Sequence, residues 1–283
     1  MWTNRFAVAR FLAAVLLALT AGASARAATA QTYYFLVFSK SVEGREAEYN
    51  KWYDDRHAAD VVSIPGFMTA QRYVQSDVPF FRVVDVQLPK YLIVYKIVSA
   101  DVESVFTEVE RRIKTGETYM SPAYDRKNSL NYVYQPLGPE LKGPGGDAPG
   151  AKSGEKKDYV QIVFTAMVAG KEDEFNAFYN QHHAPEVVSI PSFFRAQRMV
   201  LARPTTAAVP PTKYLAMYWA QTSDPAAVKQ AADVAGAKFT TSPAFDRMAT
   251  RGYTFRALGP LVDGDQVRAA RAKTQARKHS PAA

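Results

Sequence analysis

Two stretches of this sequence read almost alike: WYDDRHAADVVSIPGFMTAQRYV at residues 52–74 and FYNQHHAPEVVSIPSFFRAQRMV at residues 178–200. Over the slightly longer windows 48–74 and 174–200, 15 of 27 positions are identical at a constant offset of 126. The similarity continues through KYLIVY and KYLAMY, SPAYDR and SPAFDR, and PLGPEL and ALGPLV. The chain is therefore predicted to contain two equivalent units of about 105 residues each.

Both units are predicted to have the same order of elements. Runs rich in β-branched and aromatic residues predict strands, and the first of them begin at Thr32 and Asp158. A helix with an aromatic face follows, and it is expected to end before Pro65 or Pro191 because a residue that precedes proline disfavours helical geometry. Two further strands, a second helix and a last strand complete the order βαββαβ, which is that of the ferredoxin-like unit.

A single ferredoxin-like unit leaves one face of its sheet uncovered. Two such sheets placed face to face bury both apolar faces, so the sequence predicts an α+β fold in which two units pack on each other within one chain. The predicted domains are residues 31–140 for the first unit, 141–157 for a flexible linker rich in Gly, Pro and Lys, 158–262 for the second unit, and 263–283 for a basic disordered tail.

Residues 1–30 are predicted to be a secretory signal peptide. Arg5 and Arg10 precede the apolar run FLAAVLLALTAGA, and small residues follow it. The run is shorter than the roughly 20 apolar residues that span a bilayer, and an uncleaved membrane anchor is the alternative interpretation. The expected product is a soluble periplasmic or secreted bacterial protein without stable membrane insertion. Because the chain contains no cysteine, packing alone must hold its fold.

The formal net charge of +8 at pH 7 is concentrated at the two ends of the chain. Without the predicted signal peptide and tail, 27 basic residues stand against 25 acidic residues. A nearly neutral body does not indicate a nucleic-acid-binding surface. The basic tail is either a solvated terminus or a segment that touches an anionic membrane surface. The expected partner is a small, largely apolar ligand, and the expected state is a monomer with an internal pseudo-dimer, with a higher oligomer left open.

The segments NKWYDDRHAADVVSIPGFMTAQRY and NAFYNQHHAPEVVSIPSFFRAQR resemble the first helix and second strand of dimeric α+β-barrel proteins, in particular the EthD-like branch. The resemblance extends from Tyr33 to about Leu261. It implies two ferredoxin-like units that form an intramolecular dimeric α+β barrel, with a ligand cavity between each sheet and its helices. The superfamily includes cofactor-free oxygenases, isomerases, polyketide cyclases and haem proteins. The first segment departs from the family pattern with Ala59 where the second has Pro185, and the second has Ser192 where the first has Gly66.

Two histidines stand at equivalent places, His57 and His183, and an acid follows each of them three residues later, Asp60 and Glu186. The predicted position is the flank of the aromatic face, near the C-terminus of the first helix. A carboxylate one turn away can orient an imidazole that titrates near neutrality, which suits a general base or acid. The alternative is a structural histidine stabilised by the helix dipole. The second stretch keeps the fuller pattern, so His183 with Glu186 is the predicted principal site.

Six more side chains in the two units are candidates for ligand contact. The tyrosines offer hydroxyl groups, although aromatic residues at this spacing also build cores. The arginines lie on predicted strands, where a structural ion pair is favoured over binding of a ligand carboxylate or carbonyl. The candidates are Tyr53, Tyr95, Tyr179, Tyr218, Arg72 and Arg198.

Motifs for other chemistry are missing from the sequence. Four histidines, no cysteine and no closed-site spacing do not predict a metal site, and no cofactor is expected. The sequence has neither a Gly-rich phosphate loop nor a Gly-x-Ser-x-Gly motif. Two functions stay open. One is cofactor-free acid–base catalysis of isomerase, cyclase, lyase or oxygenase type on a small apolar carbonyl or aromatic compound. The other is non-catalytic binding or carriage of such a ligand, and haem binding is a third alternative.

Overall fold

The computed structural model describes residues 29–81, 87–203 and 212–279. Nearly all of the predicted signal peptide thus lies outside the described residues. The first half of the chain contains β1 (Gln31–Ser39), α1 (Glu46–Trp52), the π-helical turn η1 (Tyr53–His57), α2 (Ala58–Val62), β2 (Phe67–Gln75), β3 (Tyr91–Ser99), α3 (Val102–Thr115), the 3-10 turn η2 (Arg126–Asn128) and β4 (Leu130–Pro136).

The second half repeats this order among its described residues, except that it has a plain turn in place of η2, and it adds an element at each end. Its elements are β5 (Leu141–Lys142), β6 (Lys157–Thr165), α4 (Glu172–Phe178), the π-helical turn η3 (Tyr179–His183), α5 (Ala184–Val188), β7 (Phe193–Leu201), β8 (Tyr214–Thr222), α6 (Pro225–Gly236), β9 (Arg251–Asp263) and α7 (Gly264–His279).

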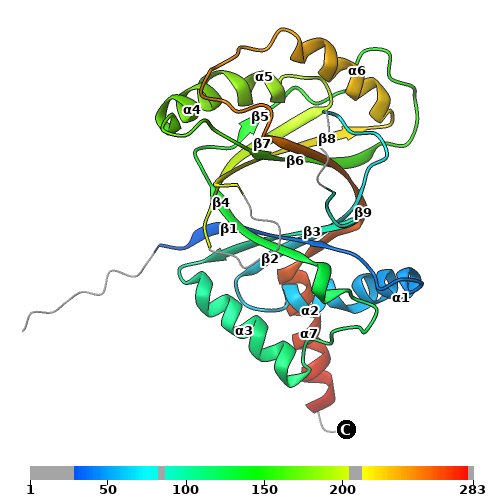
Figure 1. Ribbon diagram of the computed structural model, residues 1–283. Coiled ribbons are helices and arrows are strands. Elements are labelled where there is room, and N and C mark those ends of the chain that lie inside the picture. The colour runs from blue at the N-terminus through cyan, green and yellow to red at the C-terminus, as the bar shows by residue number, and fades with distance from the viewer. Residues whose placement is uncertain (1–28, 82–86, 204–211, 280–283) are drawn as a thin grey trace, which may run out of the picture.

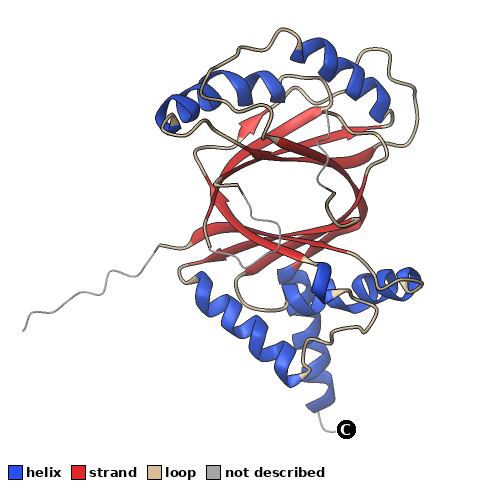
Figure 2. Ribbon diagram, viewed as in Figure 1, coloured by secondary structure: helices blue, strands red, loops and turns tan. Residues whose placement is uncertain are grey.

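The strands form one closed, antiparallel barrel. Within the halves the strand orders are β4-β1-β3-β2 and β9-β6-β8-β7, which is the ferredoxin-like order twice. The halves join where β2 pairs with β9 and β4 pairs with β7, and β5 adds to the outer part of β7. Figures 1 and 2 show the two sheets facing each other in the middle, with helices on both outer sides. The predicted fold, two ferredoxin-like units in an intramolecular dimeric α+β barrel, is confirmed.

Alternation along the strands places one apolar set inside the barrel and another beneath the helices. Side chains of both halves fill the interior, and the ring of Phe38 lies 6.0 Å from that of Phe164 and 5.8 Å from that of Phe255. Outside, each sheet forms a separate apolar core with its own helices. The uncovered sheet faces that the sequence analysis anticipated are thus buried against each other.

Local signals in the sequence define the ends of the helices. In α3, the Asp101 carboxylate accepts hydrogen bonds from the backbone N–H groups of Glu103 and Ser104, both at 3.1 Å. The helix ends at Gly116, whose φ of 78° is a left-handed conformation that glycine adopts at little cost. Asp224 caps α6 in the same way.

The segment predicted as a flexible linker, 141–157, is in part packed against the second half. Its strand β5 pairs with β7, and the Gly143 N–H donates to the carbonyl of Phe194 at 3.0 Å. A Cβ added to Gly143 would lie 2.4 Å from the carbonyl oxygen of Val188. Ala148 is also buried. The expectation of a free linker is therefore wrong at this end, because glycine allows the backbone to approach α5 and β7 closely.

The predicted disordered tail is instead the helix α7. Its start is capped by the Asp263 carboxylate, which accepts from the Gln266 N–H at 2.9 Å, and its sequence is rich in the helix-forming residues Ala, Lys, Arg and Gln. Arg268 donates to the carbonyls of Val62, at 2.7 Å, and Phe67, at 2.9 Å. The basic composition that suggested disorder thus serves to dock the helix. No helix within the described residues combines the length and apolar character required to cross a membrane.

Candidate functional site

Both histidines lie inside a continuous helix and not near its end. The α-helical hydrogen bonding of α1 gives way to the π-helical turn η1 and resumes in α2, and the same happens through α4, η3 and α5. His57 and His183 close the two π-helical turns. Such turns are rare and frequently accompany functional sites, but no pattern in this sequence predicted them.

His57 is a buried, neutral imidazole. Its ring stacks on Trp52 with centroids 4.2 Å apart and meets the Tyr53 ring edge-on at 5.0 Å. Only 7% of the residue is exposed, and its Nδ1 has no hydrogen-bond partner among the described residues. Burial lowers the pKa of His57 to about 3, against the weaker opposing effect of the Asp60 charge.

His183 has a similar aromatic surround but is less deeply buried. The rings of Phe178, Tyr179 and Phe245 lie 5.7, 4.9 and 5.0 Å from its imidazole. Its Nδ1 is also without a partner within the described chain. Burial lowers the pKa of His183 to about 4, although the Glu186 charge acts in the opposite direction. The expected titration near neutrality is therefore wrong for both histidines, because the surrounding rings exclude water.

The two carboxylates bind other partners. Asp60 accepts from Arg56 Nε at 3.0 Å and from Arg271 Nη2 at 2.5 Å. Glu186 accepts from the Thr240 N–H at 3.1 Å and from its hydroxyl at 2.5 Å. Among the described residues neither acid forms a hydrogen bond to its histidine. The expectation that the acids orient the imidazoles is thus not met, since Arg56 and Arg271 bind Asp60 and Thr240 binds Glu186.

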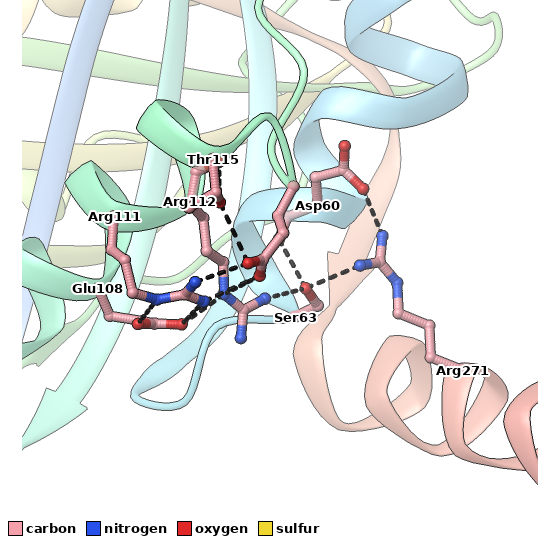
Figure 3. A network of polar contacts seen from close by, with 8 residues as sticks. Asp60, Ser63, Glu108, Arg111, Arg112, Thr115 and Arg271 are labelled. Carbon is pink, nitrogen blue, oxygen red and sulfur yellow. Dashed lines mark hydrogen bonds and ion pairs between the residues drawn. The ribbon is translucent and has the colours of Figure 1, made fainter.

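The contacts of Asp60 belong to a larger polar network that joins α2, α3 and α7, shown in Figure 3. The Ser63 hydroxyl donates to the Asp60 carbonyl at 2.7 Å. It accepts from Arg271 of α7 at 3.0 Å and from Arg112 of α3 at 3.1 Å. Arg112 is paired in turn with Glu108 at 2.7 Å. The network therefore fixes α2, which directly follows His57, relative to both α3 and α7.

The two strand arginines point toward the first helices, where their partners differ. Arg72 is buried and forms an ion pair with Asp54 and a 2.8 Å hydrogen bond to Asn50. This is the structural ion pair that the sequence analysis favoured. Arg198 is equally buried but donates to Asn180 at 2.6 Å and to Asn176 at 2.9 Å. No carboxylate of the described chain pairs with it, and burial lowers its pKa from the ordinary value.

A cavity of about 720 Å³ lies between the first sheet and its helices. His57, Tyr53 and Tyr95 form part of its wall, and Arg203 reaches it from the second half of the chain. The wall is otherwise mainly apolar, with contributions from Phe35, Val37, Val61, Phe106, Val109 and Ile113.

The corresponding cavity of the second half has only about 180 Å³. His183, Tyr179 and Tyr218 line it, and the two tyrosine hydroxyls lie 3.2 Å apart. The segment that follows β2 reaches the second half of the chain. Phe80 is fully buried with its ring 5.7 Å from Phe193, and Phe81 lines the cavity. The first half thus inserts aromatic rings into the second, and the volumes favour the His57 half as a binding site.

The structure also places in these walls residues that the sequence analysis did not select. Arg126 lines the first cavity and Arg247 lines the second. They are the last residues of SPAYDR and SPAFDR, so their recurrence in a repeated motif was a signal that could have identified them. Arg203 and Phe81 had no such signal, because each reaches the opposite half of the chain. No group of three or more potential metal ligands occurs within the described ranges.

Comparison with known proteins gives a likeness at the level of the fold. No family model matches the sequence, and no curated protein matches it. Among solved structures, an anthrone oxidase-like protein aligns with a TM-score of 0.48 at 11% identity, covering 83% of this chain and 93% of that chain. A mutant chlorite dismutase from Candidatus Nitrospira defluvii aligns with a TM-score of 0.41 at 10% identity, covering 84% and 94%. Such values carry no information about ligand or reaction.

Proposed function

We propose that this chain binds a small, largely apolar carbonyl or aromatic compound in the cavity between the first sheet and its helices. The observation that carries the proposal is the cavity itself. Its volume of about 720 Å³ falls within the range of roughly 300–1,000 Å³ typical of ligand sites. Most side chains of its wall are aromatic or aliphatic, and the charged side chains of Glu103, Glu110, Arg126 and Arg203 also line it. The corresponding cavity of the second half, which Phe81 lines, has only about 180 Å³.

His57 is best suited to accept or donate a hydrogen bond as a neutral imidazole. A general base works best with a pKa near the working pH, and burial lowers the pKa of His57 to about 3. Binding without chemistry is therefore the function that the geometry supports best. Catalysis of isomerase, cyclase, lyase or oxygenase type requires a ligand whose own charge or polarity raises that pKa.

The origin and location of the chain form part of the same proposal. The 15 identities between the two windows and the shared order of elements support a tandem repeat of an EthD-like unit. The apolar run after Arg5 and Arg10 supports export to the periplasm or the medium. The ligand is then a compound met outside the cytoplasm, and a binding or carrier protein fits that location.

A pair of cavity-filling variants tests the proposal. Ile113 lies half-buried on α3 in the first cavity, and Gly236 ends α6 at the second cavity with nothing within 4 Å of an added Cβ. The neutral fluorescent probe N-phenyl-1-naphthylamine is expected to bind the wild-type protein and Gly236→Trp. The same probe is expected not to bind the Ile113→Trp variant. Retained binding in Ile113→Trp, or no binding to the wild-type protein, contradicts the proposal.

Two measurements on the purified protein address the ligand directly. Mass spectrometry of a denatured extract is expected to release a compound with an apolar carbonyl or aromatic group. An absorption spectrum tests the haem alternative, because bound haem gives an intense visible band. His57→Gln separates the two remaining functions: it is expected to weaken binding only modestly, whereas complete loss of turnover of the released compound with retained binding favours catalysis.

A further inference from the structure

The motif SPAYDR, residues 121–126, has a structural use for most of its members. The Ser121 hydroxyl accepts from the Ala123 N–H at 3.1 Å, and Ala123 is fully buried. Tyr124 packs against the Trp52 ring at 5.6 Å. The Asp125 carboxylate accepts from the N–H of Asn128 at 3.2 Å and so caps the turn η2. These contacts explain why the fold keeps the first residues of the motif.

The equivalent motif SPAFDR, residues 242–247, repeats these contacts. The Ser242 hydroxyl accepts from the Ala244 N–H at 3.1 Å, and Ala244 is fully buried. The Phe245 ring lies 5.8 Å from that of Tyr179. Asp246 accepts from the N–H of Met248 at 3.1 Å. The fold therefore uses the same members of the motif in both halves, and in neither half does the side chain of the final arginine take part in these contacts.

Arg126 and Arg247 are the residues that these contacts do not explain. Both are exposed, and within the described chain neither guanidinium forms an ion pair or a hydrogen bond. Each nevertheless lines the cavity of its own half. Other wall positions changed between the halves, since Asn131 of the first cavity corresponds to Gly252 of the second. An arginine with no structural partner has thus kept its place beside both cavities.

The charges around the first cavity leave Arg126 available. Arg203, the other cation of the wall, is paired with Glu103 at 2.9 Å and lies 4.6 Å over the Phe106 ring. Glu110, on α3, is the remaining acid of the wall. Burial raises the pKa of the Tyr124 hydroxyl, which also lines this cavity, and the Arg126 charge opposes that rise. The positive charge of Arg126 therefore acts on groups of the cavity wall.

We infer that Arg126 binds an anionic group of the ligand at the mouth of the first cavity, while the apolar body of the ligand fills the interior. A carboxylate is the group best matched to the planar guanidinium, which can donate two parallel hydrogen bonds to it. The ligand class is thus an aromatic or otherwise apolar carboxylic acid. Arg247 is the equivalent residue of the smaller cavity. The inference rests on the proposed function and names the chemical class of its ligand.

Two fluorescent probes with the same anilinonaphthalene body test the inference. The neutral probe is N-phenyl-1-naphthylamine, and 8-anilinonaphthalene-1-sulfonate adds one anionic group that stands in for the carboxylate. Arg126→Gln is expected to weaken binding of the sulfonated probe about tenfold or more, since a hydrogen bond to a charged group is lost. Binding of the neutral probe is expected to change less than about twofold.

A neighbouring residue provides the matched control. Lys127 is exposed, lies in the same turn and is not part of the cavity wall, so Lys127→Gln removes the same charge without touching the proposed contact. It is expected to leave both affinities within about twofold. Glu110→Gln, which removes the opposing charge, is expected to strengthen binding of the sulfonated probe. Ile113→Trp must abolish binding of both probes, which assigns them to this cavity.

The outcomes separate this inference from the proposed function. Equal effects of Arg126→Gln and Lys127→Gln on the sulfonated probe, or no effect of Arg126→Gln, overturn the inference. If the neutral probe still binds in the cavity, the proposed function survives that result. Binding of neither probe to the wild-type protein overturns both.

Discussion

Ser192 carries a local strain that its counterpart avoids. Its φ is 80°, a conformation that favours glycine, and its buried hydroxyl has no partner among the described residues. The equivalent residue is Gly66, with φ 95°. Ser192→Gly is therefore expected to raise the free energy of unfolding by about 1 kcal/mol, measured by urea denaturation.

The reverse substitution is the natural control. A Cβ on Gly66 would lie 2.9 Å from Val105 Cγ2, so Gly66→Ser meets both the backbone strain and a steric contact. It is expected to lower the free energy of unfolding by more than about 1 kcal/mol. Equal stability of Ser192→Gly and the wild-type protein would show that the surroundings already compensate the strain at residue 192.

The two neutral histidines predict how stability depends on pH. An unfolded imidazole titrates near pH 6.5, whereas burial lowers the pKa of His57 to about 3 and that of His183 to about 4. At a pH between the folded and the unfolded pKa, the unfolded chain binds more protons than the folded chain. The contribution of each neutral histidine to the free energy of unfolding is therefore fully present above about pH 6.5 and declines as the pH falls. Each histidine is expected to contribute a slope of about 1.4 kcal/mol per pH unit between about pH 6 and pH 5.

His57→Gln isolates one of these slopes. Glutamine does not titrate, so the variant should lose about half of the decline in stability between about pH 6 and pH 5. Urea unfolding followed by circular dichroism at several pH values measures this. An unchanged slope in the variant would mean that His57 titrates alike in the folded and unfolded chain, and so is not buried in solution.

At the scale of elements, two equivalent glycines begin the segments that the sequence analysis misjudged. Gly143 lies against the carbonyls of Val188 and Phe193, and Gly264 lies 2.6 Å, measured from an added Cβ, from the carbonyl of Phe67. The chain after β4 and the chain after β9 therefore cover the same part of each half. The repeat continues through these glycines at the offset of 121 that relates SPAYDR to SPAFDR, so an alignment carried further could have predicted packing there.

Arg271 is expected to hold α7 in place through Asp60. Only 8% of the Asp60 side chain is exposed, and Arg271 supplies one of its two ionic partners. Arg271→Ala should lower the free energy of unfolding by about 1–2 kcal/mol, because a mostly buried carboxylate loses a charged donor. Hydrogen exchange should also become faster in α2.

Lys273 on the same helix serves as the control for this substitution. It is exposed, and no ion pair involves it in the described part of the chain. Lys273→Ala removes the same charge and is expected to change the stability by less than about 0.5 kcal/mol. Equal effects of the two substitutions would indicate that α7 is held by its general positive charge and not by the Asp60 contact.

For the molecule as a whole, the order of elements was predictable and the site was predictable only in part. Strand runs, aromatic helix faces and Pro65 and Pro191 are local signals, and local signals predict local structure. The sequence also located both histidines on the first helices of the halves. The burial of His183 depends in part on the ring of Phe245, which comes from the segment after α6, and the wall of the second cavity includes Phe81 from the other half. Neither dependence leaves a periodic pattern.

The closed barrel makes the two halves a single cooperative unit. Four strands of each half share one interior, and the pairings β2–β9 and β4–β7 leave no seam between the halves without backbone hydrogen bonds. A defect in the interior must therefore weaken both halves together, whereas a defect under the helices of one half weakens that half first.

Phe38 is the residue at which this can be measured. It is fully buried in the interior, with its ring close to Phe164 and Phe255 of the second half. Phe38→Ala is expected to lower the free energy of unfolding by about 3–5 kcal/mol and to leave a single calorimetric transition at a lower temperature. Two separate transitions, with only one displaced, would contradict a shared core. Phe106→Ala, which removes a ring beneath α3 alone, is the matched control: it should accelerate hydrogen exchange in the first half more than in the second.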